Sequence, residues 1–257
     1  MTFAANSTLV ADLHPSPNID ERRRELQPTM LILHYTGLPT IERSIEVLAD
    51  PRGKVSCHYV VALDGRITQM VAEQKRGWHA GVSIWRGESD INSASIGIEI
   101  QNAGHDAGNP AFPAVQMLAV RDLCLDICSR HAILPEGILA HSDVAPARKK
   151  DPGERFDWPW LANAGVGHWV APEMIGGPGR VLAVGDQGEA VRDMQRLLAA
   201  YGYGIEQSGM FDAASELVVI ALQRHFRPAR VDGRYDASTA ATLERLIAAL
   251  PAAKPIV

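Results

Sequence analysis

Short apolar runs and alternating segments mark the first hundred residues of the chain. Residues 30–35 (MLILHY) form an apolar run after polar, proline-containing sequence, which predicts a buried strand that ends at His34 or Tyr35. Residues 58–63 and 67–71 flank Asp-Gly-Arg and predict a hairpin, because Asp-Gly supplies the turn conformation.

Residues 95–101 (SIGIEIQ) alternate strictly between apolar and small or polar positions. Such a strand places its three isoleucines on one face and Gly97, Glu99 and Gln101 on the other. Between Pro113 and His131 the apolar positions follow helical spacing: Met117, Val120, Leu123, Cys124 and Ile127. The N-terminal part is therefore predicted to be α+β, a mixed sheet flanked by helices.

The pattern changes after Trp169. Residues 172–179 (PEMIGGPG) have the glycine and proline content of a hinge. Three helical stripes follow, which predict a small all-α three-helix module. Their apolar positions are Val191, Met194, Leu197, Leu198 and Tyr201; then Leu217, Ile220 and Ala221; then Leu243, Leu246, Ile247 and Leu250.

The module contains a short internal repeat, an echo of one segment in a later one. Residues 209–215 (GMFDAAS) resemble residues 233–239 (GRYDAST). In each copy a glycine and an aromatic residue precede Asp212 or Asp236, which is well placed as the N-cap of the next helix. The module has no ionisable cluster of its own, and a hinge precedes it. We therefore expect residues 181–250 to act as a tether.

Composition narrows the possible functions. The chain has 257 residues, 46% hydrophobic and 21% charged, and its 25 Lys and Arg against 30 Asp and Glu give a net charge of −5. Nucleic-acid binding usually needs a basic excess, so no nucleic-acid partner is expected. No apolar run approaches the roughly 20 residues that span a bilayer, so integral membrane association is not expected.

Location is left open by the sequence. The first ten residues lack the charged and apolar parts of an export signal. Three cysteines, Cys57, Cys124 and Cys128, are too few to imply a disulfide framework and are expected to be buried thiols.

One set of residue types suggests metal chemistry. His141 and Asp151 lie ten residues apart in a loop with no helical or strand periodicity, and His34 ends a predicted strand. Two imidazoles and one carboxylate suit Zn²⁺ and leave a fourth position open for water. The alternative is structural: His141 caps a loop, and Asp151 pairs with Arg148 or Lys150.

Five segments, in this order along the chain, together resemble the zinc-dependent N-acetylmuramoyl-L-alanine amidases of bacteria, a family that shares its fold with the peptidoglycan recognition proteins. They are residues 31–36 (LILHYT), 56–60 (SCHYV), 77–87 (GWHAGVSIWRG), 95–100 (SIGIEI) and 141–153 (HSDVAPARKKDPG). The resemblance covers about residues 16–169. It implies one Zn²⁺ per chain, bound by His34, His141 and Asp151.

The resemblance also implies catalytic roles for Glu99 and Lys149. Glu99 would take a proton from water and pass it to the leaving amine, and Lys149 would stabilise the oxyanion. The alternatives are a surface carboxylate on a strand and a solvated lysine in a basic run.

The family places a glycine-rich loop beside its substrate groove, which implies substrate contacts for Trp78, His79 and Arg86. An aromatic ring can stack on a sugar, and a guanidinium can pair with a peptide carboxylate. Trp78 could instead fill the core, and His79 could brace the loop. His58 and Tyr35 are expected to support ligand orientation or packing.

The second module resembles the small helical peptidoglycan-binding domain of wall hydrolases, through residues 184–198 (VGDQGEAVRDMQRLL) and 209–213 (GMFDA). This resemblance favours the periplasm or cell envelope, although no export signal is seen. We therefore predict an amidase domain over residues 1–172, a linker over 173–180, a peptidoglycan-binding domain over 181–250 and a tail over 251–257.

The predicted activity is hydrolysis of the amide between the lactyl group of N-acetylmuramic acid and L-Ala of the stem peptide. The partner is therefore peptidoglycan or its muropeptides, in wall turnover or in recycling. A catalytically silent wall-recognition protein is the main rival, and a zinc hydrolase of another amide is a third possibility.

Overall fold

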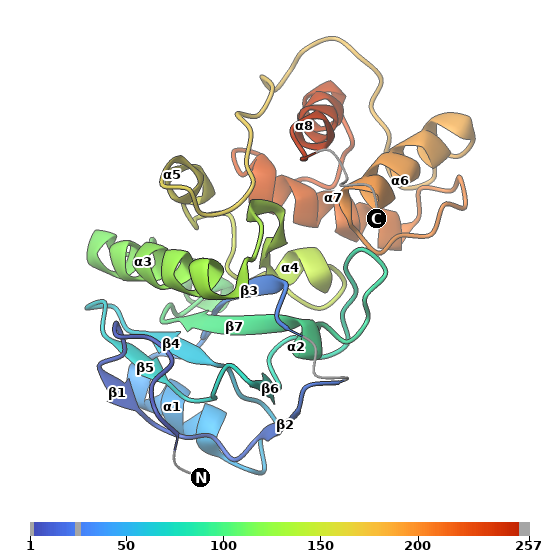
Figure 1. Cartoon of the computed structure of the whole chain (residues 1–257). Helices are drawn as coiled ribbons and strands as arrows, with labels where there is room; N and C mark the ends of the chain where they lie inside the picture. The colour runs from blue at the N-terminus through green and yellow to red at the C-terminus, as the bar shows by residue number, and fades with distance from the viewer. Residues whose placement is uncertain (1–2, 24–26, 252–257) are drawn as a thin grey trace.

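A computed structural model describes residues 3–23 and 27–251. Its first part is built on a six-stranded mixed sheet of order β1-β5-β4-β7-β3-β8 (Figure 1). The strands are β1 (Asp12–Leu13), β3 (Met30–Tyr35), β4 (Tyr59–Val61), β5 (Ile67–Gln69), β7 (Ser95–Ile100) and β8 (Ile138–Ala140). A separate antiparallel pair joins β2 (Ile19–Glu21) to β6 (Lys75–Gly77).

The centre of the sheet is parallel. β3 lies between β7 and β8, and β4 pairs in parallel with the other edge of β7. β4 and β5 form the predicted antiparallel hairpin, in shorter strands than the sequence pattern predicted. The fold class is therefore confirmed, and the expected strand over residues 30–35 has the predicted bounds.

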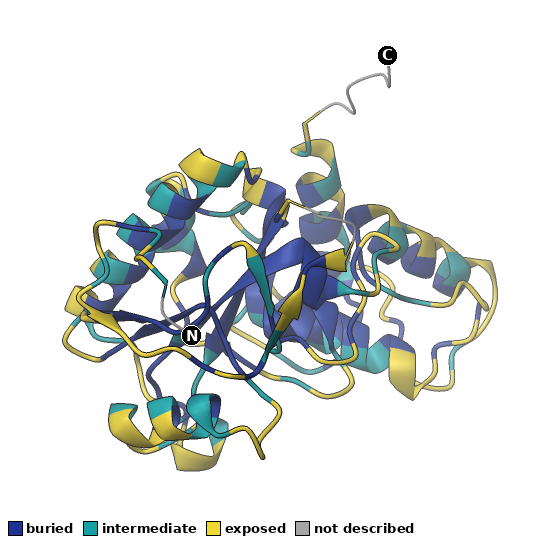
Figure 2. Cartoon of the chain, turned by 60° about the horizontal axis from the view of Figure 1, so that its bottom comes forward, coloured by how far each residue is buried: buried dark blue, intermediate teal, exposed yellow. Residues whose placement is uncertain are grey.

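Helices cover both faces of the sheet. α3 (Ala114–His131) lies on one face, where Val120 and Leu123 pack with the odd-numbered leucines of β3 and the three isoleucines of β7. α1 (Ile41–Ala49) lies on the other side, where Leu48 packs with Val60 and Met70. Figure 2 shows the sheet as the buried layer between exposed helix surfaces. The alternation of β7 therefore sends Gly97 and Glu99 to the face away from α3.

Shorter helical elements complete the first part. They are α2 (Ile91–Ala94), the 3-10 turns His105–Ala107 and Pro135–Gly137, α4 (His141–Val144) and α5 (Trp158–Asn163). α4 starts directly where β8 ends, and α5 begins at Trp158 with Asp157 as its N-cap.

Three helices form the second part: α6 (Glu189–Tyr201), α7 (Ala213–Phe226) and α8 (Ala237–Ala248). Asp212 and Asp236 cap α7 and α8 by accepting hydrogen bonds from the backbone of Ser215 and Thr239, as the echo predicted. The segment 170–181 that leads to them contains no helix or strand and loops over the molecule in Figure 1. The predicted tail, residues 251–257, lies outside the described residues except for Pro251.

The predicted apolar stripe of α7 needs correction. Leu217 and Ile220 are only partly buried, whereas Val218, Val219 and Leu222 are buried. The buried face is displaced because α7 packs against α4 of the first part as well as within its own module. Leu250 follows the end of α8 but still packs against the core.

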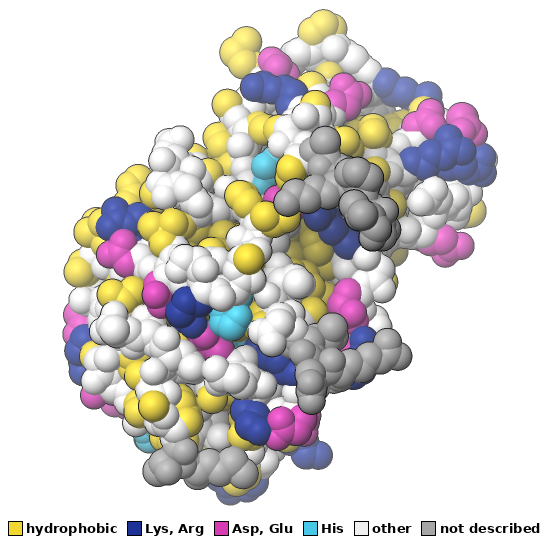
Figure 3. Space-filling view, viewed as in Figure 1, with side chains coloured by type: hydrophobic (Ala, Val, Ile, Leu, Met, Phe, Trp, Pro, Cys, Tyr) yellow, Lys and Arg dark blue, Asp and Glu magenta, His cyan; other side chains and the backbone are white. Residues whose placement is uncertain are grey.

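Cys57 and Cys124 are buried free thiols, as expected, and Cys128 is partly buried. No helix in the described ranges is long and apolar enough to cross a bilayer. On the face shown in Figure 3, acidic and basic side chains are interspersed rather than segregated. Local ion pairs, such as Arg192 with Glu189 on α6, place opposite charges side by side.

Candidate metal centre and active site

His34, His141 and Asp151 converge at one edge of the sheet. His34 lies near the carboxyl end of β3, and His141 follows the carboxyl end of its parallel neighbour β8. The loop that carries Asp151 returns to this edge, where the Asp151 carbonyl accepts a hydrogen bond of 3.0 Å from the Ser142 N–H. Neighbouring parallel strands end at the same edge, which explains how residues more than a hundred positions apart meet.

The three ligand atoms are close and buried. His34 Nδ1 lies 2.8 Å from His141 Nδ1 and 3.1 Å from Asp151 Oδ2, and His141 Nδ1 lies 2.9 Å from the same oxygen. The three residues are at most 6% exposed. Ligands bonded at roughly 2.0–2.1 Å to a tetrahedral zinc would lie about 3.3 Å apart. The cluster is therefore within a few tenths of an ångström of that geometry.

Hydrogen bonds behind His34 decide where its proton lies. Ser95 Oγ–H donates to the Ile91 carbonyl over 2.6 Å, so its oxygen is free to accept from His79 Nε2–H at 3.3 Å. His79 Nδ1 then accepts from His34 Nε2–H at 3.1 Å. His34 is left with an unprotonated Nδ1 that faces the cluster.

The same logic applies to His141, whose Nε2–H donates to the Ala80 carbonyl over 3.1 Å. Two nitrogen lone pairs and a carboxylate oxygen of Asp151 therefore face one another with no proton between them. Such an arrangement is repulsive unless a cation lies among the three atoms. The residues present fit a divalent metal with nitrogen and oxygen ligands, of which zinc is the usual choice.

The ionisation states agree with this role. Burial, with the neighbouring His141, lowers the pKa of His34 to about 4, so its ring is neutral at neutral pH. Burial alone would raise the pKa of Asp151, but it is held below its usual range, because any proton in the cluster is held by a neighbouring imidazole, His141 first, and its charge and hydrogen bond favour the carboxylate. Metal ligation needs these same forms, a neutral imidazole and a carboxylate.

Glu99 and Lys149 lie beside the three ligands. Glu99 is the register partner of His34 on β7, and its buried Oε2 has no hydrogen-bond partner among the described residues. Burial and the charge of Asp151 raise the pKa of Glu99 well above its usual value, while the nearby Lys149 opposes the shift. The Lys149 backbone N–H donates to the Ala145 carbonyl, which holds the lysine at the pocket wall.

These residues line one cavity of about 470 Å³ that is open to solvent. Its walls also come from α1 and from the segments that follow β3 and β7: Tyr35, Thr36, Leu38, Ser44, Val47, Leu48, His105 and Asp106. A buried cation site with a titratable carboxylate and a lysine in one cleft is the arrangement of a hydrolytic active site.

Comparison with known proteins agrees with this geometry. The family model described as N-acetylmuramoyl-L-alanine amidase matches residues 24–154, and a peptidoglycan binding domain model matches residues 187–243. The amidase AmiD of Escherichia coli strain K12 is 36% identical over 233 residues, which cover 85% of this chain and 82% of AmiD. The chain belongs to the N-acetylmuramoyl-L-alanine amidase family.

Solved structures extend this relationship. The complex of E. coli AmiD with anhydro-N-acetylmuramic acid-L-Ala-D-gamma-Glu-L-Lys superposes on this amidase with a TM-score of 0.74 and 35% identity, covering 89% of this chain and 92% of AmiD. AmpDh3 from Pseudomonas aeruginosa gives a TM-score of 0.69 and 30% identity, covering 96% and 97%. The 1,6-anhydro-N-acetylmuramyl-L-alanine amidase AmpD of E. coli strain K12 is 35% identical, but its 161 matched residues cover only 56% of this chain and 86% of AmpD. The match to AmiD thus extends into the helical second part of this chain, whereas the match to AmpD covers little more than half of this chain.

The glycine-rich loop differs from the sequence-based expectation. Of its three expected substrate contacts only His79 lines the metal cavity. Trp78 donates its indole N–H to Asp20 over 2.8 Å. Arg86 extends toward the helical module, where its Nε donates to the Tyr201 carbonyl at 3.3 Å. The structure therefore does not bring Trp78 or Arg86 to the cavity, because the loop turns away after Ala80.

His79 supports a ligand, as its bond to His34 shows, and Gly97 makes room for it. A Cβ at Gly97 would lie 2.5 Å from His79 Cγ. His58 also serves this region, because its Nδ1 accepts from the Gly97 N–H at 3.0 Å and its burial lowers its pKa to about 3. A side chain at position 97 would therefore displace the His79 ring from β7.

Two further residues of the cavity wall contact one another. Tyr35, which the sequence assigned to ligand orientation or packing, directly follows a metal ligand, and its hydroxyl lies 3.0 Å from His105 Nδ1. His105 stands in a 3-10 turn with no motif around it, and its Nε2 lies 3.0 Å from Glu154. The structural alternative for Asp151 is not observed: Arg148 donates to the carbonyls of Ala80 and Val82 instead.

Proposed function

We propose that this chain uses a zinc ion held by His34, His141 and Asp151 to hydrolyse the amide between the lactyl group of N-acetylmuramic acid and the first L-Ala of the stem peptide. The observation that carries the proposal is the proton-free cluster of two imidazole nitrogens and one carboxylate oxygen. The family relationship and the muropeptide named in the AmiD complex support this choice of bond.

Bound zinc supplies Lewis acidity, which polarises a carbonyl and lowers the pKa of water. The protein residues handle the protons. Glu99 accepts the proton of the attacking water as the water oxygen bonds to the amide carbon, and then delivers it to the nitrogen as the C–N bond breaks. The products are a lactyl carboxylate and a peptide that begins with L-Ala.

Lys149 has an electrostatic role. The carbonyl oxygen gains negative charge as water adds, and an ammonium group at the wall of a partly closed cavity stabilises that charge more strongly than it would in bulk water. The influence of Lys149 on the pKa values of both His34 and Glu99 supports its closeness to the reacting groups.

His79 is assigned to positioning in this proposal. Its hydrogen bond to His34 Nε2 fixes the ring orientation and directs Nδ1 to the metal. Substrate contacts are assigned instead to the cavity walls near Tyr35 and His105.

The proposed division of the chain has an amidase domain over residues 1–172, a linker over 173–180 and a peptidoglycan-binding domain over 181–250. The match of residues 187–243 to a peptidoglycan binding domain supports the last of these. A silent wall-recognition protein would have no need, beside a cation site, for a carboxylate such as Glu99 whose buried Oε2 has no hydrogen-bond partner among the described residues. This favours an enzyme over that rival.

Product analysis tests the proposal. The protein is incubated with a soluble anhydro-muropeptide and, separately, with insoluble sacculi, each with and without a chelator. Mass spectrometry should detect stem peptides that begin with L-Ala, the chelator should abolish them, and added zinc should restore them. Products cleaved at another amide, or no products from either substrate, would contradict the proposed activity.

A further inference from the structure

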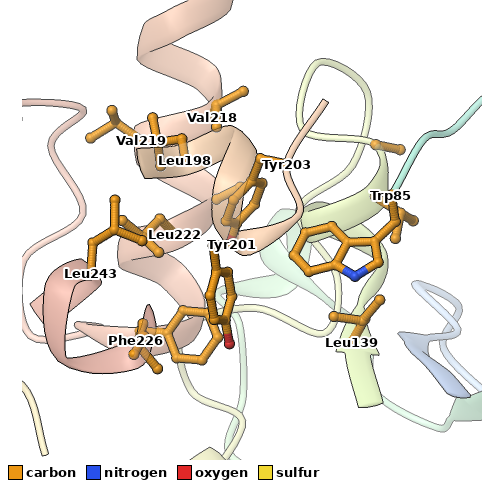
Figure 4. Close-up of a cluster of buried hydrophobic side chains, with 14 of the residues drawn as sticks. Trp85, Leu139, Leu198, Tyr201, Tyr203, Val218, Val219, Leu222, Phe226 and Leu243 are labelled. Atoms are coloured by element: carbon orange, nitrogen blue, oxygen red, sulfur yellow. The ribbon is translucent and has the colours of Figure 1, made fainter. Parts of the chain in front are cut away.

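The helical module shares a hydrophobic core with the amidase domain. Figure 4 shows Trp85 and Leu139 of the first domain facing Tyr201 and Tyr203 of the module. The Trp85 and Tyr203 rings meet edge to face with centroids 4.9 Å apart. A hinged tether would leave such side chains exposed, so the sequence-based expectation of a tether is wrong on this point.

A buried carboxylate lies at this junction. Asp143 belongs to α4, two residues after the metal ligand His141, and it is 0% exposed. Its Oδ1 accepts a hydrogen bond of 2.8 Å from the Tyr203 hydroxyl, and its Oδ2 accepts one of 2.7 Å from His225 Nδ1–H. The Ala140 N–H supplies a third donor at 2.8 Å. Two of the three donors therefore come from the module.

These donors matter because a buried carboxylate without partners is costly. α4 has only four residues, so its own helical hydrogen bonds hold it weakly. The His225 ring that donates to Asp143 is itself held by stacking: its centroid lies 3.8 Å from that of Trp158 in the first domain and 3.8 Å from that of Phe226 in the module. The bonds to Asp143 therefore fix the position of α4 relative to the module. Because His141 is the first residue of α4, they also fix where its side chain begins.

A second line of contacts runs from the module to the cavity wall. Arg224 Nε of α7 donates to Glu154 Oε2 over 3.2 Å, and the same oxygen lies 3.0 Å from His105 Nε2. His105 Nδ1 in turn meets the Tyr35 hydroxyl at 3.0 Å. Both Tyr35 and His105 line the metal cavity. The module thus contacts the metal-ligand helix α4 through Asp143. It contacts the proposed substrate-binding wall of the cavity through Glu154 and His105.

We infer that the peptidoglycan-binding module is also a positioning part of the active site: Tyr203 and His225 hold the metal-ligand helix α4 through Asp143, and Arg224 holds the cavity wall through Glu154. The inference rests on the proposed zinc site. It assigns Tyr203, His225 and Arg224 as positioning residues, which touch neither the metal nor the substrate.

The test compares two full-length variants. Tyr203→Phe removes the hydroxyl that binds Asp143 but keeps the ring contacts. Tyr201→Phe is the matched control, because it removes a buried hydroxyl of the same module, one bonded to His168 Nδ1 at 2.8 Å rather than to α4. Zinc affinity is measured by competition with a chromogenic chelator, and kcat/KM is measured on a soluble muropeptide, for which wall anchoring is irrelevant.

Tyr203→Phe should weaken zinc binding by about tenfold, the lower range for loss of a group that supports a ligand, and should lower kcat/KM on the soluble substrate. Tyr201→Phe should stay within about twofold of wild type in both, because its hydroxyl bonds to His168 and not to α4. The inference is overturned if Tyr203→Phe matches wild type, or if both variants lose zinc equally. Failure of the wild-type protein to bind zinc would instead contradict the proposed metal site.

If Tyr203→Phe fails to fold, Arg224→Gln tests the contact from the module to Glu154 at the cavity wall. This variant changes a side chain at the edge of the interface. We expect a KM for soluble muropeptide raised about threefold with zinc affinity unchanged. An unchanged KM would overturn the inference.

Discussion

His34 and Glu99 are register partners on the adjacent parallel strands β3 and β7. Their side chains therefore leave the sheet on the same face, next to one another, at the edge where the metal ligands meet. A slip of one residue in either strand would turn one of the two toward α3. The pairing of these strands thus fixes the distance between the proposed general base and a metal ligand.

Loss of either proposed catalytic group should reduce turnover without removing the metal. Glu99→Gln and Lys149→Met should each lower kcat by roughly 10²-fold or more, the size expected for loss of a general base or an oxyanion-stabilising charge. Steady-state kinetics and zinc content are measured together. Glu244→Gln, an exposed site on α8, is the control and should be neutral. Near-normal kcat in both active-site variants would favour a different mechanism.

Glu99 should also make stability depend on pH. Burial and the charge of Asp151 raise its pKa in the folded state, despite Lys149. The folded protein therefore holds this proton more tightly than the unfolded chain does. The free energy of unfolding should then fall as pH rises from the unfolded-state pKa, roughly 4.3, toward the higher folded value.

Glu99→Gln removes this titration. In chelator-treated protein, its melting temperature should exceed that of wild type at about pH 7, and the difference should shrink as the pH approaches about 4. Thermal unfolding at several pH values checks this. A difference that stays constant across the range would show that Glu99 ionises as freely in the folded protein as in the unfolded chain.

Gly97→Ala should lower zinc affinity by displacing His79, the residue that supports His34. The added Cβ would lie 2.5 Å from His79 Cγ, and the His79 ring is confined by its bonds to His34 and Ser95. Displacing that ring removes the partner of His34 Nε2, so zinc affinity should fall about tenfold. Gly177→Ala, in the linker with no described atom within 4 Å of a new Cβ, should leave zinc affinity unchanged. Equal affinity in the two variants would show that His79 does not position His34.

Local pattern was sufficient to predict most elements and the ligand types. The run at residues 30–35, the alternation at 95–101 and the caps Asp212 and Asp236 all depend on neighbours in sequence, and the structure has them as predicted. Residue types alone grouped His34 with His141 and Asp151 only beside a structural alternative, and the family resemblance decided between them, because no spacing rule shows that β3 and β8 are adjacent.

The failures have a common physical origin in tertiary packing. After His79 the loop runs to the helical module, which Arg86 contacts, and neither Trp78 nor Arg86 reaches the cavity. The donors to Asp143 are a tyrosine and a histidine with no motif of their own, 60 and 82 residues away along the chain. Contacts of this kind depend on how two domains pack, which periodicity within either domain does not describe.

The most direct test is the zinc content of purified protein by elemental analysis, for wild type, His34→Ala and the exposed-site control His14→Ala. If His34, His141 and Asp151 form the metal site on which hydrolysis depends, wild type and His14→Ala should contain one zinc per chain. His34→Ala should contain almost none and should release no L-Ala peptides. Full zinc occupancy in His34→Ala would contradict the assignment.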